Sequence, residues 1–318
     1  MKTGSGTAIQ ALVLCLGLLL PAGVGCRAEE SGNAGVRPAI AASKGFYPST
    51  PARLKEMVRG FLENAPERKG DGPIVAALAP HAGYFYSGAV AACTHKALAG
   101  ADFDTLVIIG HDTGAPDTVA FLSPADYFAT PLGKVPVDRD MIEKMLEADS
   151  NIREKEFGDH SVEVHLPFLQ LTRGEEFRIV PALFGSPNLA KCRAMADAIR
   201  SAAGKKKVIV LASTDMSHYP PYEVAGRLDR STLTLLKGGD AGKLYSHLES
   251  AERSGKFAGV QTAMCAKGGV GTALMFAKDT GQVDVEVLKY ANSGDVAMEA
   301  RGNVVGYSSV IISVKGGK

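Results

Sequence analysis

The chain of 318 residues is predicted to fold as an α/β protein, a three-layer structure in which helices cover both faces of a mostly parallel central sheet. Two observations predict this class. Short apolar segments alternate with segments of helical pattern, which favours a largely parallel sheet. Several apolar runs also end directly at polar turns that contain histidine or aspartate, and open α/β sheets place their sites at the carboxyl ends of strands.

The first 25 residues carry the pattern of a secretory signal peptide. Lys2 precedes an apolar stretch at 8–20, and a zone of small residues ends at Gly25. This stretch is too short for a stable membrane span. Because Gly25 and Cys26 resemble a bacterial lipobox, we expect an exported protein that is periplasmic or a lipoprotein, anchored to the membrane only through lipid on Cys26. Residues 26–45 are small, polar and aperiodic and are expected to form a flexible tether.

Residues 46–318 are expected to form a single α/β domain, since this length suffices for one. The formal net charge is +1 with acids and bases interspersed, which argues against a nucleic-acid partner. No two cysteines form a CxxC pair, so a disulfide framework is not expected. Cys93 and Cys192 lie inside helical patterns and are expected to be small buried core residues.

Capping residues and apolar runs predict the individual elements in chain order. Thr50 and Pro51 are typical of a helix start, and the helix is expected to reach residue 63. Ser87 is placed to cap a helix, and Asp138 to cap another. The other segments predict strands at about 73–79, 103–110, 118–122, 177–184, 207–213, 283–290 and 304–314, and helices at about 161–171, 188–203, 223–236, 240–250 and after Cys265.

Histidines follow three of these predicted strands. His81 lies in a glycine-rich turn after 73–79, His111 ends the next strand, and His218 follows 207–213 by a few residues. Because the carboxyl ends of parallel strands meet at one edge of a sheet, we expect these histidines to line one cleft. Asp215 stands three residues before His218, where a carboxylate holds a ring tautomer and raises its basicity. The alternative is that Asp215 only caps the following turn.

The remaining polar residues are weighed in the same way. His160 follows an aspartate in a glycine-bearing turn and is expected in the cleft, whereas His165 is expected to be packed and hydrogen-bonded. His95, beside a lysine, is expected at the surface or at a helix end. Cys265 precedes a helix and is either a small buried apolar residue or, with Lys267 nearby, a thiolate suited to coordination or attack.

Five segments taken together resemble the MEMO family, protein B of bacterial AmmeMemoRadiSam systems. They span about residues 40–314 in the family's order, and they are Pro80-His81-Ala82-Gly83-Tyr84 with Ser87-Gly88, Thr130-Pro131-Leu132-Gly133 with Val137-Asp138, Asp159-His160-Ser161-Val162-Glu163-Val164-His165-Leu166-Pro167-Phe168, Ser213-Thr214-Asp215-Met216-Ser217-His218, and Tyr290-Ala291-Asn292-Ser293-Gly294-Asp295 with Val305-Gly306-Tyr307.

This resemblance implies the fold of class III extradiol dioxygenases and a metal site of two histidines and one cysteine. The site would hold one divalent or redox metal ion, iron first, with copper or zinc as alternatives. The resemblance also implies radical-SAM and AMMECR-type proteins of the same system as partners, and a small molecule or a peptide in the cleft. His81 and Cys265 match two of the family's ligands, and Asp215 and His218 match residues that line the same cleft.

The second histidine ligand is where this chain departs from the family. The family reads Gly-Pro-x-His after the second strand, whereas this chain reads Gly110-His111-Asp112-Thr113, so that Thr113 falls on the ligand position. Either the turn brings His111 to the ion, with Asp112 as an alternative oxygen donor, or the protein binds metal weakly or not at all.

Three functions therefore stay open, and with them the question of whether the chain is an enzyme. The first is a mononuclear metal protein with a mixed nitrogen and sulfur ligand set. Its reaction is left open, with redox or dioxygenase-related chemistry as the options. The second is a cysteine–histidine hydrolase in which Cys265 is the nucleophile, His218 the base and Asp215 the group that orients His218. The third is a non-catalytic module that binds a peptide or a partner. In the first, the metal ligands are His81, His111 and Cys265, and the proton donors and acceptors are His160, Asp215 and His218.

Overall fold

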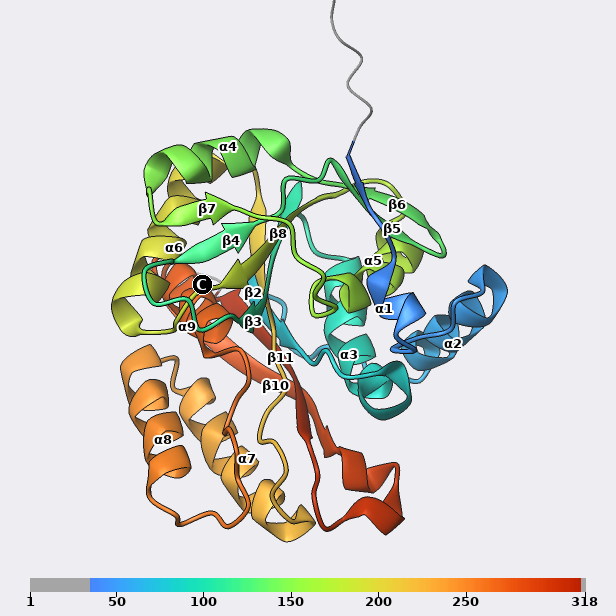
Figure 1. The fold of residues 1–318 in the computed structure, drawn as a ribbon, viewed down its shortest axis with the longest axis vertical. Coiled ribbons are helices and arrows are strands. Elements are labelled where there is room, and N and C mark those ends of the chain that lie inside the picture. Colours follow the sequence, from blue (N-terminus) through green and yellow to red (C-terminus); the bar gives the residue numbers. More distant parts are fainter. Residues whose placement is uncertain (1–34, 316–318) are drawn as a thin grey trace, which may run out of the picture. The chain divides into compact units, whose positions relative to one another are not determined.

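The structure is a computed structural model that describes residues 35–315, and the structural statements below concern this part of the chain. The predicted signal peptide and Cys26 lie outside the described residues, as do residues 27–34 of the predicted tether. Figure 1 shows two sheets with helices around them. The strands are β1 (Val36–Arg37), β2 (Ile74–Ala79), β3 (Thr105–Asp112), β4 (Ala120–Leu122), β5 (Tyr127–Thr130), β6 (Gly133–Pro136), β7 (Ile152–Glu154), β8 (Arg178–Phe184), β9 (Val208–Ser213), β10 (Val283–Asn292) and β11 (Gly306–Val314).

The larger sheet has eight strands in the order β10-β11-β2-β9-β3-β8-β4-β7. Its four central strands, β2, β9, β3 and β8, run parallel. They come from nearly continuous apolar runs, as expected of strands that are covered on both faces. At the edges, β11 runs antiparallel to β2 and β10, and β4 runs antiparallel to β8. The predicted α/β class is confirmed, with a parallel centre and mixed edges.

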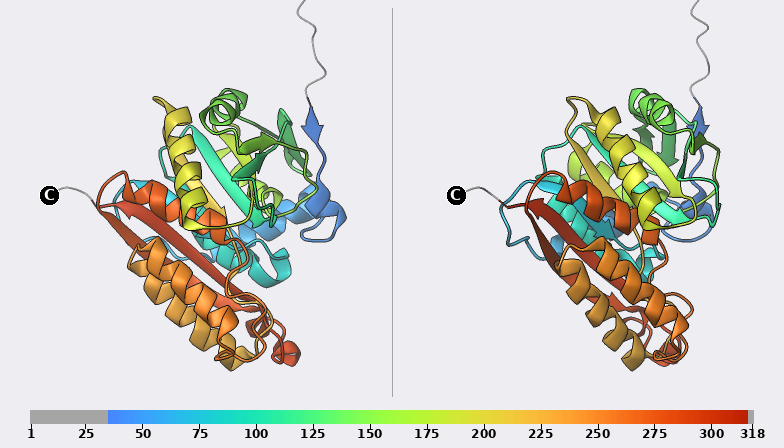
Figure 2. Two further views of the ribbon diagram at one scale, coloured as in Figure 1. Left: turned by 60° about the vertical axis from the view of Figure 1, so that its left-hand side comes forward. Right: turned by 90° about the vertical axis from the view of Figure 1, so that its left-hand side faces the viewer.

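Helices cover both faces of this sheet. On one face, α9 packs on the central strands and α6 packs on α9; on the other, α3 contacts β2, β10 and β11, and α5 packs beside it (Figure 2). The three-layer arrangement predicted from the sequence is thus present. The helices are α1 (Ile40–Ser43), α2 (Pro51–Glu63), α3 (Tyr84–Ala99), α4 (Arg139–Ala148), α5 (Leu166–Arg173), α6 (Leu189–Ala203), α7 (Tyr222–Lys237), α8 (Ala241–Arg253) and α9 (Lys267–Lys278), with 3-10 turns at Glu163–His165, Ser293–Asp295 and Met298–Ala300.

Of the three helix starts that were predicted from named capping residues, two are confirmed. Helix α2 begins at Pro51, and the side chain of Asp138 accepts a hydrogen bond from the backbone N–H of Met141 in the first turn of α4. The third was wrong, because α3 begins at Tyr84 and places Ser87 inside its first turn. There the Ser87 hydroxyl donates to the carbonyl oxygen of Ala82 at 2.8 Å.

The folded part begins earlier than the sequence suggested. Strand β1 pairs in parallel with β5, and α1 follows it, so residues 36–43 belong to the domain and not to a tether that extends to residue 45. The reason is a buried carboxylate. Glu163 is fully buried and accepts hydrogen bonds from the Arg37 guanidinium at 2.5 Å and from the backbone N–H of Ile40 at 2.8 Å. A buried charge needs such partners, and the segment before residue 46 supplies them.

Between residues 35 and 315, no helix combines the length and the apolar character needed to cross a membrane.

Candidate metal centre

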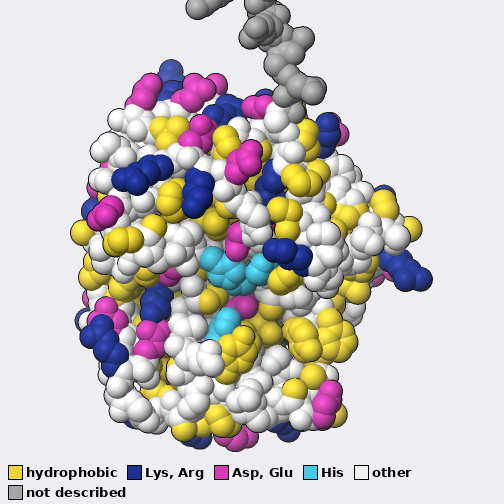
Figure 3. All heavy atoms as spheres, in the orientation of Figure 1, with side chains coloured by type: hydrophobic (Ala, Val, Ile, Leu, Met, Phe, Trp, Pro, Cys, Tyr) yellow, Lys and Arg dark blue, Asp and Glu magenta, His cyan; other side chains and the backbone are white. Residues whose placement is uncertain are grey.

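The predicted site residues gather at the carboxyl ends of the central strands. His81 follows β2, His111 lies at the end of β3, and Asp215 follows β9, while Cys265 stands just before α9. Three neighbouring parallel strands therefore deliver their polar turns to one edge of the sheet, as the topology predicts. Figure 3 shows histidine side chains together near the middle of one face of the molecule.

The three residues expected as metal ligands lie together. Potential ligand atoms of His81, His111 and Cys265 are all within 4.8 Å of one another. The Cys265 sulfur lies 3.2 Å from Nε2 of His81, and the His81 and His111 ring centroids are 4.2 Å apart. The geometry thus brings His111 beside the other two residues, although it stands two positions before the family's ligand position. Its role as a ligand stays a prediction.

A hydrogen bond on Nδ1 orients each of the two rings. Nδ1 of His81 lies 3.0 Å from the Ser213 hydroxyl oxygen, and Nδ1 of His111 lies 2.8 Å from a carboxylate oxygen of Asp159. In both rings Nε2 is the nitrogen that these partners leave free. Histidines that bind metals usually have such a partner on the other nitrogen, which fixes the ring and its tautomer.

The other residues of the turn after β3 have structural contacts instead. The backbone N–H of Thr113 donates to the carbonyl oxygen of Phe184 at 2.8 Å. Asp112 accepts from the backbone N–H of Gly268 at 3.1 Å in the first turn of α9, and burial raises the pKa of this carboxyl group to about 7. Asp112 therefore holds the start of α9, and it belongs to none of the groups with metal-binding geometry among the described residues.

Gly110 lets the loop that carries Asp159 approach β3. A Cβ atom at position 110 would lie 2.0 Å from the Ser161 hydroxyl oxygen and 3.0 Å from a methyl carbon of Leu183. Ser161 in turn bonds to Asp159 through both its backbone N–H, at 2.8 Å, and its hydroxyl group. The glycine is thus what allows the carboxylate to reach His111.

The residues expected as proton donors and acceptors surround the three candidate ligands. His160 stacks on Phe46 with ring centroids 3.8 Å apart, and its centroid is 5.2 Å from that of His111. Asp215 accepts a hydrogen bond from the backbone N–H of His81 at 2.9 Å. Its other oxygen lies 3.8 Å from Nε2 of His81 and 3.9 Å from Nε2 of His218, beyond hydrogen-bond range. Within the described residues, Nε2 of His218 has no hydrogen-bond partner.

Burial controls the charge of these groups. It lowers the pKa of His81 well below its usual value, with the nearby His111 acting in the same direction. Burial and His81 lower the pKa of His160 to about 3. At His111 burial also opposes the charged form, but the hydrogen bond and charge of Asp159 outweigh it, so that the pKa is raised. His81 and His160 are therefore held as neutral imidazoles, the form that binds metal ions, whereas Asp159 favours the charged form of His111.

The Cys265 thiol is neutral for a related reason. Burial raises its pKa well above the usual value, and the nearby Asp215 adds to this effect. The alternative in which Lys267 favours a thiolate is not supported, because burial raises the thiol pKa and the Lys267 ammonium is paired with the carboxylate of Glu252 at 2.6 Å. A bound cation would deprotonate a coordinating thiol outright.

Two histidines outside the cleft form a buried pair. His165 is fully buried, as expected, with Nε2 at 2.8 Å from the Ser213 hydroxyl oxygen. The expectation for His95 was wrong, because its side chain is fully buried and its ring stacks on Phe168 with centroids 5.0 Å apart. The signal was present in the sequence: the segment around His95 is apolar on all sides, which is typical of a buried helix.

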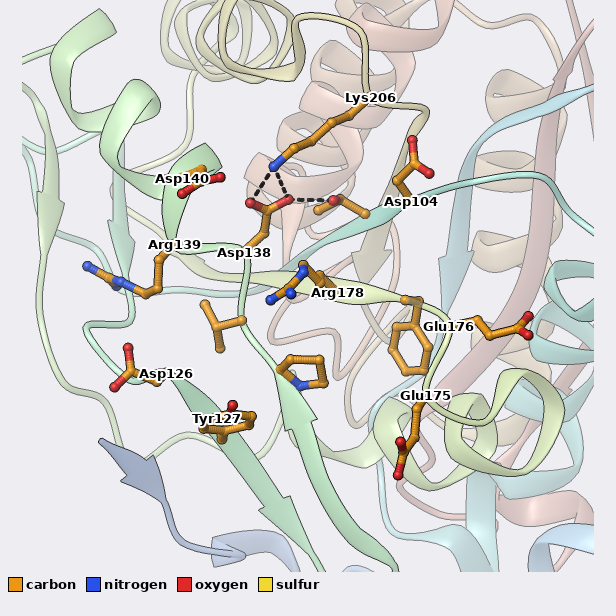
Figure 4. A pocket seen from close by; sticks show the side chains of 14 residues that line it. Asp104, Asp126, Tyr127, Asp138, Arg139, Asp140, Glu175, Glu176, Arg178 and Lys206 are labelled. Atoms are coloured by element: carbon orange, nitrogen blue, oxygen red, sulfur yellow. Dashed lines mark hydrogen bonds and ion pairs between the residues drawn. The ribbon is translucent and has the colours of Figure 1, made fainter. Parts of the chain in front are cut away.

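A pocket lies at the opposite ends of the strands. Its cavity measures about 720 Å³ and is lined by residues at or just before the starts of β3, β8 and β9, among them Asp104, Arg178 and Lys206 (Figure 4). In this pocket Lys206 binds both oxygens of Asp138, at 2.6 and 2.7 Å. Because this pocket lies at the amino ends of the strands, we place the functional site at the histidines instead.

Comparisons with known proteins identify the family of this chain. The family model described as Memo-like protein matches residues 37–311. The chain is 34% identical over 290 residues to a MEMO1 family protein of Methanopyrus kandleri, covering 86% of this chain and 97% of that protein. It is 35% identical over 283 residues to one of Archaeoglobus fulgidus, covering 87% and 99%. It is 33% identical over 284 residues to one of Thermotoga neapolitana, covering 84% and 96%. Matches that extend over most of both chains show that this protein belongs to the Memo-like protein family.

Proposed function

We propose that this protein binds one metal ion through His81, His111 and Cys265. One observation carries the proposal: ligand atoms from three separate parts of the chain lie within 4.8 Å of one another. Both imidazoles have Nδ1 engaged by another group, and Nε2 of His81 faces the sulfur of Cys265. Small movements would bring the three atoms to metal–ligand bonds of about 2.0–2.3 Å.

The ligand set favours particular metals. Two imidazoles and one thiolate form a borderline-to-soft set that suits Fe(II), copper or zinc, and iron is our first choice within the family. Three protein ligands leave open positions for water or a substrate, where the ion would supply Lewis-acid or redox chemistry. Around it, His160, Asp215 and His218 are the groups available to hold or move protons.

The cysteine–histidine hydrolase is less well supported. Potential ligand atoms of Cys265, His218 and Asp215 do lie within 4.8 Å of one another. However, Asp215 is 3.9 Å from the His218 ring nitrogen and hydrogen-bonds to the backbone of His81, so it does not orient His218 as a triad would require. The thiol pKa is also raised well above its usual value by burial, which disfavours the thiolate that would attack.

Metal analysis of protein purified without chelators tests the proposal. We expect about one ion per chain in the wild type, and a loss of affinity of roughly tenfold or more in Cys265→Ser and in His111→Ala. Thr113→Ala is the matched control, since Thr113 lies in the same turn and should leave metal content unchanged. Loss of metal in Cys265→Ser but not in His111→Ala would mean that His111 is a structural residue and not a ligand. Wild-type protein that binds neither Fe(II), copper nor zinc would overturn the proposal and favour the hydrolase or a non-catalytic binding module.

We further propose that the protein is exported and held at a membrane through lipid on Cys26, and that it works with radical-SAM and AMMECR-type proteins on a small molecule or a peptide. The signal-like segment and the family membership support these proposals. Intact mass of protein from the membrane fraction tests the first; a soluble chain that retains residues 1–25 would contradict it. Co-purification with the two partner types tests the second, and their consistent absence would contradict it.

A further inference from the structure

A continuous chain of hydrogen bonds connects the candidate ligand His81 with the core. From Nδ1 of His81 it passes to the Ser213 hydroxyl at 3.0 Å and on to Nε2 of His165 at 2.8 Å. From Nδ1 of His165 it continues to Nε2 of His95 at 3.0 Å. All four residues are buried. The Ser213 hydroxyl has one further partner, the backbone carbonyl oxygen of Ser161 at 2.6 Å.

The carbonyl oxygen of Ser161 determines where the single proton of the Ser213 hydroxyl lies. A carbonyl oxygen only accepts hydrogen bonds, so at 2.6 Å the Ser213 hydroxyl must donate to it. That donation uses the hydroxyl's one proton, and its oxygen then accepts from both ring nitrogens. His81 therefore carries its proton on Nδ1, and His165 carries its proton on Nε2.

The rest of the chain provides an independent check. Burial lowers the pKa of His165 well below its usual value and that of His95 to about 3, so each ring is neutral and has one N–H group. With Nε2 of His165 protonated, its bare Nδ1 accepts from Nε2 of His95, and Nδ1 of His95 is left as a bare acceptor. Nδ1 of His95 is indeed buried without a partner among the described residues. The reverse order of protons would leave a buried N–H donor there, and such orphaned donors are costly.

We propose that Ser213, held by the Ser161 carbonyl, is a positioning residue that keeps the His81 proton on Nδ1 and so presents a bare Nε2 to the metal ion. This inference rests on the metal site proposed above. Without the hydroxyl, Nδ1 of His81 would lose its buried acceptor. The proton would then move to Nε2, where the Cys265 sulfur at 3.2 Å accepts it, and the ligand atom would be blocked.

Long-range ¹H–¹⁵N correlation spectra of the metal-free protein test the proton arrangement directly. We expect protonated Nδ1 with bare Nε2 for His81, and protonated Nε2 for both His165 and His95. In Ser213→Ala the His81 proton is expected on Nε2. A wild-type His81 with its proton on Nε2 would overturn the inference, whatever the variant does.

Metal titrations with Fe(II) under anaerobic conditions and with Zn²⁺ test the consequence. Ser213→Ala is expected to bind each ion roughly 10- to 100-fold more weakly, and Ser213→Thr, which keeps the hydroxyl, should recover most of the affinity. Ser308→Ala is the matched control, because Ser308 is a fully buried serine of β11 whose hydroxyl has no partner among the described residues. Equal affinities in Ser213→Ala and Ser308→Ala would overturn the inference. Wild-type protein with the expected ring protons but no bound metal would instead overturn the proposed function.

Discussion

Gly110 and His111 show how two adjacent residues make different contributions to the site. Gly110 leaves room for the Ser161 side chain, and His111 receives the Asp159 carboxylate that this loop carries. From the sequence, His111 was recognisable as a histidine at a strand end, but its partner Asp159 was not. The two residues are 48 positions apart in the chain, and only the packing of the loop on β3 brings them together.

Replacing Gly110 by alanine is expected to destabilise the protein and weaken metal binding. The new Cβ atom would lie 2.0 Å from the Ser161 oxygen, so the loop must move and take Asp159 away from His111. Overpacking of this kind costs about 1–3 kcal/mol. Thermal unfolding and metal titration measure the two effects.

Gly60→Ala provides the control for this substitution. Gly60 lies inside α2, and a Cβ atom there would meet no atom within 4 Å. Because alanine is the better helix former, this variant should be more stable by roughly 0.5–1 kcal/mol, with unchanged metal affinity. Gly110→Ala protein with wild-type stability and affinity would contradict the role assigned to the glycine.

At the scale of elements, the segment formed by β1 and α1 holds the loop that carries the site. Arg37 donates to the carbonyl oxygens of Asp159 at 2.5 Å and of Phe157 at 3.3 Å, and it pairs with the buried Glu163. The short β1, β5 and β6 strands that anchor this segment were not expected. Strands of two to four residues are too short for an alternating pattern to be visible in the sequence, and their pairing depends on partners distant in the chain.

Glu163→Ala is expected to destabilise the protein by about 3–5 kcal/mol, because it leaves the Arg37 charge buried and unpaired. Metal affinity should fall as well, since Arg37 would no longer fix the loop with Asp159. Urea unfolding and metal titration measure these changes. The matched control is Glu249→Ala in α8, where the ion pair with Arg253 at 2.9 Å is exposed and contributes roughly 0.5 kcal/mol or less. Similar losses of stability and metal affinity in both variants would contradict the larger contribution expected of the buried pair.

At the scale of the whole molecule, the parallel centre of the sheet explains why the site could be predicted in outline. Alternation of strands and helices predicts parallel neighbours, and parallel neighbours place His81, His111 and Asp215 at one edge. The order of the strands and the antiparallel edges were not predictable in this way. They depend on which apolar faces pack together, and an apolar run such as that of β11 has no feature that specifies its direction.

The same buried core makes the stability of the whole domain sensitive to acid, and His95 offers the clearest test. Burial lowers its pKa to about 3 from an unfolded value near 6.5. Between these values the unfolded chain binds a proton that the folded chain does not, so the free energy of unfolding falls as the pH falls. The stabilising contribution of neutral His95 to the free energy of unfolding is fully present above about pH 6.5. Below that pH it decreases by about 1.4 kcal/mol for each pH unit.

His95→Gln removes this titration while retaining a side-chain donor for His165. We expect the variant to be less stable than the wild type at pH 7, because the ring no longer stacks on Phe168, and the two stabilities to converge between pH 6 and pH 4. Urea unfolding at a series of pH values gives the free energy of unfolding against pH for both proteins, and the two slopes are then compared. His247→Gln is the control, since His247 is only partly buried in α8 and its pKa is lowered less far. Parallel curves for His95→Gln and the wild type would contradict the lowered pKa, because they would mean that His95 takes up its proton at the same pH in the folded and the unfolded chain.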